Sequence, residues 1–179
     1  MTPTDDALLL EHYIHRGHES WNVSLEASYL DYELRRCLLQ RMPAKRPLRV
    51  CNIGVGVGLW DDWLGYVAGS SITSVDRDHG ICELFALRQK RERHPHPAYV
   101  ICGDVLAGIL DGQQYDLITC VGSTLGESGD APGLHQAMLA ALAPDGVLFE
   151  AEVRESTGLP GVALVCTFTG ADGRPIQQA

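Results

Sequence analysis

Residues 48–76, LRVCNIGVGVGLWDDWLGYVAGSSITSVD, decide the fold of this chain. One apolar run ends at Ile53 and a second occupies Ile72 to Val75, with a segment of amphipathic-helix character from Leu59 to Val67 between them. A strand, a glycine turn, a helix and a second strand make one βαβ unit, which belongs to a parallel sheet. The sequence therefore predicts an α/β fold.

The turn after the first strand carries three alternate glycines, Gly54, Gly56 and Gly58. Glycine accepts positive φ and lets the backbone come close to a ligand, because it has no Cβ. Asp76 ends the second strand, where a carboxylate can accept hydrogen bonds from both hydroxyls of a ribose. The glycines and the acid together indicate a nucleoside cofactor.

The residues around the turn help to decide which nucleoside is bound. A dinucleotide fingerprint would have its third glycine at position 59, which is Leu59 here. Helix N-termini attract pyrophosphate through their partial positive charge, but Asp61 and Asp62 lie in the first turn, and no Lys or Arg occurs from Val50 to Val75. Two carboxylates disfavour a phosphate there. S-adenosylmethionine, which has adenosine, a sulfonium and an amino acid but no phosphate, fits better than NAD.

Segment 50–58, VCNIGVGVG, resembles motif I of the class I S-adenosylmethionine-dependent methyltransferases, and Asp76 stands where that family places its ribose-binding acid. Residues 99–105, YVICGDV, are similar to the third strand of the family and its adenine-contacting Asp. Residues 115–121, YDLITCV, resemble the fourth strand, and residues 142–148, LAPDGVL, the turn before the fifth. The motifs follow the family's order over residues 47–153. The third strand is expected over residues 99–102, the fifth over residues 147–153 and a short helix over residues 105–110, and Gly69 is expected to end the helix after the glycine turn.

The resemblance implies a doubly wound, Rossmann-like, mostly parallel sheet with an antiparallel C-terminal hairpin, and S-adenosylmethionine as the cofactor. The chain departs from the family at Asn52, where Asp or Glu is usual; the amide can still accept a hydrogen bond from the methionine amino group but has no charge. The cofactor-binding residues that the resemblance implies are Asn52, Gly54, Gly56, Gly58, Asp76, Arg77, Gly103, Asp104, Val105, Val121 and Gly122.

The two ends of the chain are predicted to differ from the central unit. Helical spacing of apolar residues over residues 7–42 predicts an N-terminal helical cap, residues 1–44, ahead of a cofactor-binding unit, residues 45–179. Small members of the family typically carry such an extension over the cofactor cleft. Near the other end, residues 162–169 and 174–178 are expected to form a hairpin. The last helix of the family is predicted to be missing or reduced, which would expose a sheet face for a second subunit, as in a homodimer.

Composition limits the partners and the compartment. The chain of 179 residues has a net charge of −9, which argues against nucleic acid or an anionic membrane as a partner. No stretch approaches the ~20 apolar residues of a membrane span. The six cysteines have neither C-x-x-C nor His/Cys ligand spacing, so reduced thiols, no metal site and a cytoplasmic location are expected. A solvated helix end is expected for one basic cluster, Arg88, Lys90, Arg91 and Arg93.

Methyl transfer from a sulfonium is an in-line displacement in which the protein mainly aligns the nucleophile, and positioning can contribute ~7–11 kcal/mol. A general base is needed only if the acceptor must lose a proton. His18 and Glu127 are the candidates, each with a solvated or structural role as the alternative. The family's Asp/Asn-Pro-Pro-aromatic tetrapeptide is absent after the fourth predicted strand, which favours a small-molecule acceptor. Two alternatives stay open: an S-adenosylmethionine-binding protein without methyl transfer, and an NAD-dependent oxidoreductase.

Overall fold

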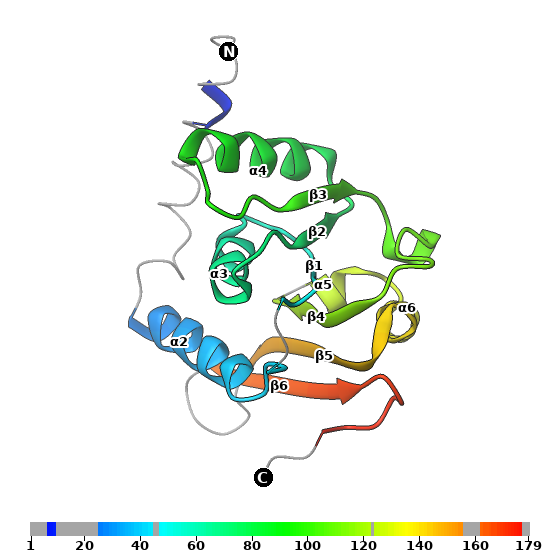
Figure 1. Ribbon diagram of the computed structural model, residues 1–179. Coiled ribbons are helices and arrows are strands. Elements are labelled where there is room, and N and C mark those ends of the chain that lie inside the picture. Colours follow the sequence, from blue (N-terminus) through cyan, green and yellow to red (C-terminus); the bar gives the residue numbers. More distant parts are fainter. Residues whose placement is uncertain (1–6, 10–24, 45–46, 123, 156–161, 177–179) are drawn as a thin grey trace.

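A sheet of six strands, in the order β3-β2-β1-β4-β5-β6, forms the centre of the computed structural model (Figure 1). The structure describes residues 7–9, 25–44, 47–122, 124–155 and 162–176. Strands β1 to β5 run parallel and β6 pairs antiparallel with β5, so the predicted fold class is confirmed. The strands are β1 (Val50–Ile53), β2 (Thr73–Asp76), β3 (Tyr99–Cys102), β4 (Tyr115–Val121), β5 (Leu142–Glu155) and β6 (Val162–Gly170).

Helices cover both faces of the sheet (Figure 1). Helices α2 (Leu25–Leu39) and α3 (Leu59–Ala68) contribute buried residues to an apolar cluster on one face. Helix α6 (Ala131–Ala140) and the 3-10 turn η2 (Val105–Ala107) do so on the other. Helix α4 (His79–Glu92) packs against β2 and β3, and the single turn α5 (Thr124–Glu127) follows β4. The two faces are called the α3 face and the α6 face below.

Strand β1 shows how the sequence divides its side chains between the faces. Successive residues of a strand point to opposite faces. Cys51 and Ile53 therefore join the apolar cluster of the α6 face, whereas Val50 packs in the cluster of the α3 face. Asn52 alternates with its neighbours and hydrogen-bonds to Asp61 of α3. A polar side chain in this strand is thus buried beneath the glycine turn.

Local side chains set the helix boundaries. The carboxylate of Asp78 caps α4 by accepting a hydrogen bond from the backbone N–H of Ile81 at 3.1 Å. Asp130 caps α6 in the same way through the N–H of Gly133, at 2.9 Å. Gly69, with φ +66°, ends α3 where the sequence predicted.

Three elements differ from the prediction. The expected helix at residues 105–110 is the three-residue η2. Strand β5 begins at Leu142 rather than Val147, because Leu142 already pairs with Tyr115 before a register shift in β4. In the part of the hairpin that the structure describes, the second strand is reduced to an isolated bridge between Thr169 and Pro175.

The predicted N-terminal cap is described only in part. Leu34 and Leu38 of α2 are buried in the cluster of the α3 face, beside Leu64 of α3. Residues 10–24 lie outside the described residues, so the boundary between residues 44 and 45 and the covering of the cleft stay predictions. None of the described helices has both the length and the apolar character that crossing a membrane requires.

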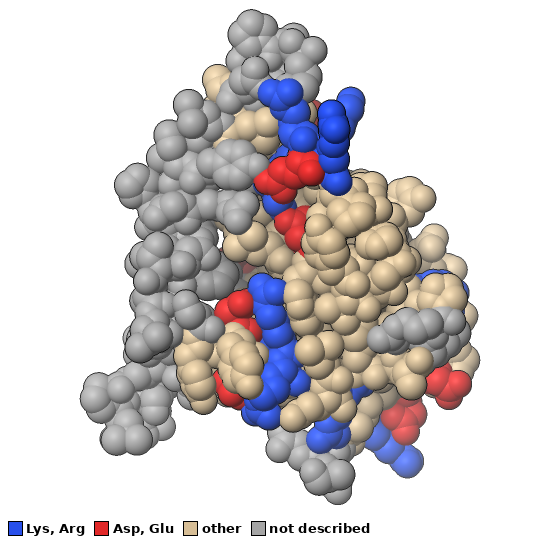
Figure 2. All heavy atoms as spheres, turned by 60° about the vertical axis from the view of Figure 1, so that its left-hand side comes forward, with Lys and Arg blue, Asp and Glu red and all other residues tan. Residues whose placement is uncertain are grey.

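The face in Figure 2 carries basic and acidic side chains next to one another. Helix α2 contributes two such pairs: Arg35 with Asp31, whose closest atoms are 2.8 Å apart, and Arg36 with Glu33, at 2.6 Å. Paired charges of opposite sign largely cancel one another beyond the ion pair itself, so the described part of α2 does not present a field of one sign.

Candidate cofactor site

The carboxyl ends of four parallel strands meet at one edge of the sheet. From β1 the chain crosses to β2 on one side, and β4 lies on the other side. The edge between β1 and β4 is therefore a topological switch point, where doubly wound sheets bind their ligands. The residues that directly follow the four strands are Gly54, Arg77, Gly103 and Gly122, all of which the sequence predicted to bind the cofactor.

The three positions of the turn require glycine for different structural reasons. All have positive φ: +85° at Gly54, +52° at Gly56 and +75° at Gly58. A Cβ at Gly58 would collide with the ring of Phe85, and one at Gly54 with the side chain of Thr124. At Gly56, no described atom lies within 4 Å of the Cβ position. Gly54 and Gly58 are therefore required by packing, whereas Gly56 leaves open space that a ligand can approach.

The Asp76 carboxylate is fixed beside this turn. Its Oδ2 accepts a hydrogen bond from the N–H of Val55 at 2.8 Å, and its Oδ1 accepts one from the N–H of Asp78 at 2.9 Å. Each oxygen of an ionised carboxylate can accept about two hydrogen bonds, so with respect to the described residues each oxygen keeps one further position. The two positions match the two donors of a ribose.

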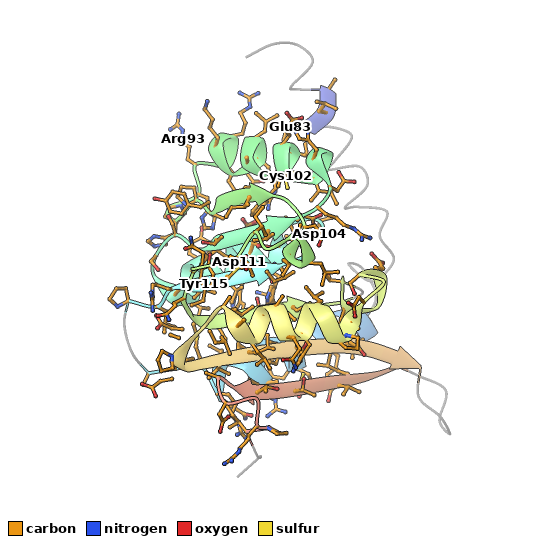
Figure 3. All side chains as sticks on the ribbon, turned by 90° about the vertical axis from the view of Figure 1, so that its right-hand side faces the viewer. Glu83, Arg93, Cys102, Asp104, Asp111 and Tyr115 are labelled. Atoms are coloured by element: carbon orange, nitrogen blue, oxygen red, sulfur yellow. The ribbon has the colours of Figure 1, made fainter. Side chains whose placement is uncertain are left out.

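The end of β3 provides the third part of the edge. Cys102 and Asp104 lie close together there, one on each side of Gly103 (Figure 3). Gly103 donates its N–H to the carbonyl of Asp76 at 2.9 Å, which ties this turn to the previous strand. Asp104 caps η2 through the N–H of Leu106, and the side chain of Val105 is only 5% exposed within the core. Because Val105 as a whole residue is buried, its contact with a cofactor stays a prediction.

The segment after β4 crosses the edge. Gly122 has φ +89° and follows Val121, which packs against the cluster of the α3 face. Arg77, at the end of β2, donates to the carbonyl of Glu127 at 3.1 Å, so these two predicted residues are brought together. The side chain of Glu127 is exposed. The other predicted base, His18, lies outside the described residues.

Asn52 is buried beneath the turn and takes part in a hydrogen-bond network in which each donor and each acceptor is defined. Its Nδ2 donates to the carbonyl of Gly54 at 2.8 Å and to Oδ1 of Asp61 at 3.0 Å. Its Oδ1 accepts from the hydroxyl of Thr119 at 2.7 Å, and that hydroxyl oxygen accepts from the indole of Trp60 at 3.2 Å. With 1% exposure, Asn52 acts on the backbone of the turn, and its contact with the methionine amino group stays a prediction.

Asp61 closes this network from below. It is 1% exposed, and its Oδ1 also accepts a hydrogen bond from the hydroxyl of Ser74 at 2.5 Å. Burial raises the pKa of Asp61 from 3.8 to about 7, against the hydrogen bonds from Ser74 and Asn52, which lower it. None of the described residues offers Oδ2 a hydrogen bond. A buried carboxylate whose second oxygen has no partner among these residues thus lies directly under the candidate site.

Arg88 corrects two sequence interpretations. It is 1% exposed rather than solvated, and it lies over the Phe85 ring at 5.3 Å. Its guanidinium pairs with Asp62 at 2.7 Å and with Glu92 at 2.9 Å, and it donates to the carbonyl of Gly58 at 3.3 Å. The charge of Asp62 is therefore compensated by a cation from α4, and Asp61 turns inward. The expectation that two free carboxylates would repel a phosphate here is wrong in that form.

One pair of titratable residues was not among the sequence predictions. His135 of α6 places its Nδ1 2.9 Å from both carboxylate oxygens of Glu150 in β5. The pair lies on the α6 face, next to Cys120, which is the β4 residue in register with Glu150. The partners are 15 residues apart on two different elements, so no local spacing could have indicated the contact.

Burial makes four of the six thiols poor nucleophiles. All six cysteines are free. Burial raises the pKa of Cys120 to about 12 and is also the main cause of raised pKa values at Cys51, Cys82 and Cys166. Within the described residues, no group of three or more His, Cys, Asp or Glu side chains is arranged to hold a metal ion.

Comparison with known proteins gives matches in structure only. No protein-family model matches the sequence, and no curated protein matches it. A methyltransferase from Aquifex aeolicus that is described as SAM-dependent matches over 70% of this chain and 68% of its own, with 14% identity and a TM-score of 0.59. Coclaurine N-methyltransferase bound to N-methylheliamine and SAH matches over 75% of this chain and 38% of its own, with 15% identity and a TM-score of 0.60.

The fold is that of the class I S-adenosylmethionine-dependent methyltransferases. The [4+2]-cyclase SpnF has this fold too, with 18% identity and a TM-score of 0.62 over 70% of this chain and 46% of its own. The present chain spans about half the length of several structures that it matches. The methyltransferase fold accounts for the antiparallel β5–β6 pair as well as for the glycine turn.

Proposed function

We propose that this protein is an S-adenosylmethionine-dependent methyltransferase that acts on a small-molecule acceptor. The observation that carries the proposal is the Asp76 carboxylate, fixed by the N–H groups of Val55 and Asp78 beside the open side of Gly56. One acceptor position remains on each carboxylate oxygen, and a ribose supplies two donors. The open backbone at Gly56 leaves room for the rest of the ligand.

When bound, S-adenosylmethionine supplies a methyl group on a sulfonium, which is already an activated leaving group. The chain then has to hold the acceptor in line and to exclude water. For an acceptor that must lose a proton, we propose Glu127 or His18 as the base. Glu127 is the one within the described residues, and the hydrogen bond from Arg77 to its carbonyl keeps α5 near the end of β2.

Two features support a small molecule as the acceptor. The net charge is −9, and the described ion pairs of α2 mix both signs, which is unfavourable for a polyanion. A neighbour of the same fold, coclaurine N-methyltransferase, is bound to N-methylheliamine, a small molecule. The methylated atom, whether oxygen, nitrogen or carbon, depends on the acceptor contacts.

Calorimetric titration tests the cofactor. We expect the protein to bind S-adenosylhomocysteine and not NAD, and Asp76→Ala to weaken binding by about tenfold or more, because hydrogen bonds to a charged group contribute about 1.5–3 kcal/mol each. Asp76→Asn keeps the shape and tests the charge. Asp172→Ala, which removes an exposed carboxylate of a distant loop, is the matched control. Tight NAD binding, or full affinity in Asp76→Ala, would overturn the proposal.

A second candidate is a protein that binds S-adenosylmethionine without methyl transfer. The specific observation in its favour is the match to SpnF, a [4+2]-cyclase with the same fold. Asn52, uncharged where the family usually has an acid, is compatible with this alternative. An assay with radioactive methyl groups over a panel of phenols, alcohols and amines separates the two: transfer to any acceptor supports the enzyme, and cofactor binding without transfer supports the alternative.

Self-association and a cytoplasmic location complete the proposal. The α6 face of the β5–β6 pair would be the surface between two copies. Its described residues include Thr167 and Val165, of which Val165 is 37% exposed. Light scattering during gel filtration gives the mass of the particle, and a mass of one chain at micromolar concentration would exclude the dimer.

A further inference from the structure

We propose that Asp61 is a positioning residue for the cofactor: through Asn52 it holds the carbonyl of Gly54, and it supplies from beneath the turn a negative charge that favours a cationic adenosine ligand. This inference rests on the proposed function. It extends that function by assigning a role to a residue outside the turn and by predicting how the site distinguishes charged from neutral ligands.

The first supporting observation is the position of Asp61. Its side chain lies between α3, β1 and β2, bonded to Asn52 at 3.0 Å and to Ser74 at 2.5 Å. Asn52 is the side chain that links Asp61 to the backbone of the turn, since the same Nδ2 donates to the carbonyl of Gly54 at 2.8 Å. A change at Asp61 therefore reaches the turn through two hydrogen bonds.

The second observation is the direction of the hydrogen bonds. Trp60 donates to Thr119, and Thr119 donates to Oδ1 of Asn52. This fixes which end of the Asn52 amide faces Asp61 and Gly54, and both amide hydrogens are then used. An acceptor at Asp61 is needed to complete the arrangement, so Asp61 locks the orientation of the Asn52 amide.

The third observation is the unusual state of the carboxylate. Asp61 is 1% exposed, and its Oδ2 has no hydrogen-bond partner among the described residues. A structural role alone would be met at lower cost by an amide or an apolar side chain, because an unpaired buried carboxylate is unfavourable. A carboxyl group kept at such a cost is explained if a ligand of opposite charge binds above it.

The surrounding charges leave Asp61 available for this role. Asp62 of the same helix is paired with Arg88 of α4, which also reaches the carbonyl of Gly58. On β1, the neighbouring titratable group is the buried thiol of Cys51, whose pKa is raised by burial and by Asp61. Asp62 raises the pKa of Asp61 further. A cation bound at the turn would oppose these effects and favour ionised Asp61.

Three ligands that differ in charge test the inference. S-adenosylmethionine carries the positive charge of its sulfonium, S-adenosylhomocysteine lacks that charge and is a zwitterion, and 5′-methylthioadenosine lacks both the sulfonium and the amino-acid part. At pH 8, we expect Asp61→Asn to lower the affinity for S-adenosylmethionine by about tenfold. The affinity for S-adenosylhomocysteine should fall by less, and that for 5′-methylthioadenosine by under twofold. Asp172→Asn, which removes one exposed charge far along the chain, should change none of the three affinities.

The double variant Asn52→Asp/Asp61→Asn separates the effect of charge from that of hydrogen bonding. It exchanges the two side chains, so that position 52 carries the carboxylate and position 61 carries the amide. We expect it to recover most of the lost affinity for S-adenosylmethionine. If it recovers none, or if Asp61→Asn weakens the three ligands equally or not at all, the inference is overturned. If the wild-type protein binds none of the three, the proposed function fails instead.

A measurement on the wild-type protein keeps the inference testable if Asp61→Asn does not fold. With the Asp61 pKa at about 7, part of the protein is protonated at pH 6.5. Calorimetry in buffers of different ionisation enthalpy should then detect release of a fraction of a proton on binding S-adenosylmethionine, and less with 5′-methylthioadenosine. Equal proton release with both ligands would contradict the role of Asp61.

Discussion

The two faces of the sheet bury different kinds of side chain. On the α6 face, strand residues such as Cys51, Ile53, Ile118 and Leu148 form an apolar cluster, and Glu150, which is bonded to His135, is a charged exception. On the α3 face, the strands and the helix below the glycine turn bury polar groups at 1% exposure or less: Asn52, Asp61, Ser74 and Thr119. Buried polar groups are costly unless they are hydrogen-bonded. Beneath the glycine turn, the polar groups of the α3 face therefore hold the site in place at a cost in stability, whereas the apolar clusters of both faces contribute stability.

Replacing Arg88 should have the largest effect. In Arg88→Ala, Asp62 loses its partner, and the carbonyl of Gly58 loses a donor. Removing one member of a buried ion pair costs about 3–5 kcal/mol, so we expect a loss of this size in the free energy of unfolding, measured in urea. Lys90→Ala removes an exposed charge from the same helix and should cost under about 0.5 kcal/mol. Equal effects of the two variants would mean that Arg88 is not a buried anchor of the α3 face.

A core truncation on the α6 face should be nearly as costly, but without effect on the site. Met138 is 0% exposed in α6, and Met138→Ala should lower the free energy of unfolding by about 2–5 kcal/mol. Met138→Leu, of similar volume, should cost less than about 1.5 kcal/mol. Calorimetry on the folded fraction should give unchanged affinity for S-adenosylhomocysteine. A loss of affinity would mean that the cofactor site depends on the packing of the α6 face as well as on the α3 face.

The sequence predicted the central elements because their signals are local. The turn, α3 and β2 follow from the alternation of apolar runs and from Gly58 and Gly69 at the ends of the helix. Strand β3 has the bounds that its apolar run predicts, Tyr99 to Cys102. Strand ends in a parallel sheet meet at one edge, so the position of Asp76 beside the turn follows from the chain order of the strands alone.

The polar groups beneath the site could not be predicted in the same way. The sequence predicts a free charge for Asp61 at a helix N-terminus, whereas in the structure Asp61 turns inward to Asn52 and Ser74, which lie on two other elements. Arg88 stands among other basic residues in the sequence, so its burial could not be predicted from its charge. Its spacing of three from Phe85, itself three residues after Cys82, does follow the buried stripe of α4, and that spacing was an available signal. Contacts between distant elements, such as His135 with Glu150, leave no signal in one sequence.

The buried carboxylate of Asp61 should make stability depend on pH. Its pKa is about 7 in the folded protein, against 3.8 ordinarily, so between about pH 4 and pH 7 the folded state keeps a proton that the unfolded state has lost. The contribution of Asp61 is therefore fully present below about pH 4 and is lost as the pH rises through about 7. In the wild type this should remove roughly 2–4 kcal/mol across the window.

Asp61→Asn should abolish that part of the pH dependence, whereas Asp172→Asn should retain it. Urea unfolding at intervals of half a pH unit gives both curves. Because other groups titrate in the same window, the comparison uses the difference between each variant and the wild type at each pH. A difference for Asp61→Asn that does not change with pH would mean that Asp61 stays ionised in the folded protein, and the polar α3 face would then be less costly than we infer.

The smallest expected effect comes from the hydrogen-bonded pair of His135 and Glu150 on the α6 face. The side chain of His135 is 29% exposed and that of Glu150 is 10% exposed, so water screens the pair in part. We therefore expect a coupling energy of about 1 kcal/mol or less in a double-mutant cycle of His135→Ala and Glu150→Gln, measured by urea unfolding at low and at high salt. A coupling above about 2 kcal/mol that persists in high salt would show that this pair is as strongly desolvated as Arg88 with Asp62. Both faces would then carry buried charge, and a polar network would no longer distinguish the face beneath the candidate cofactor site.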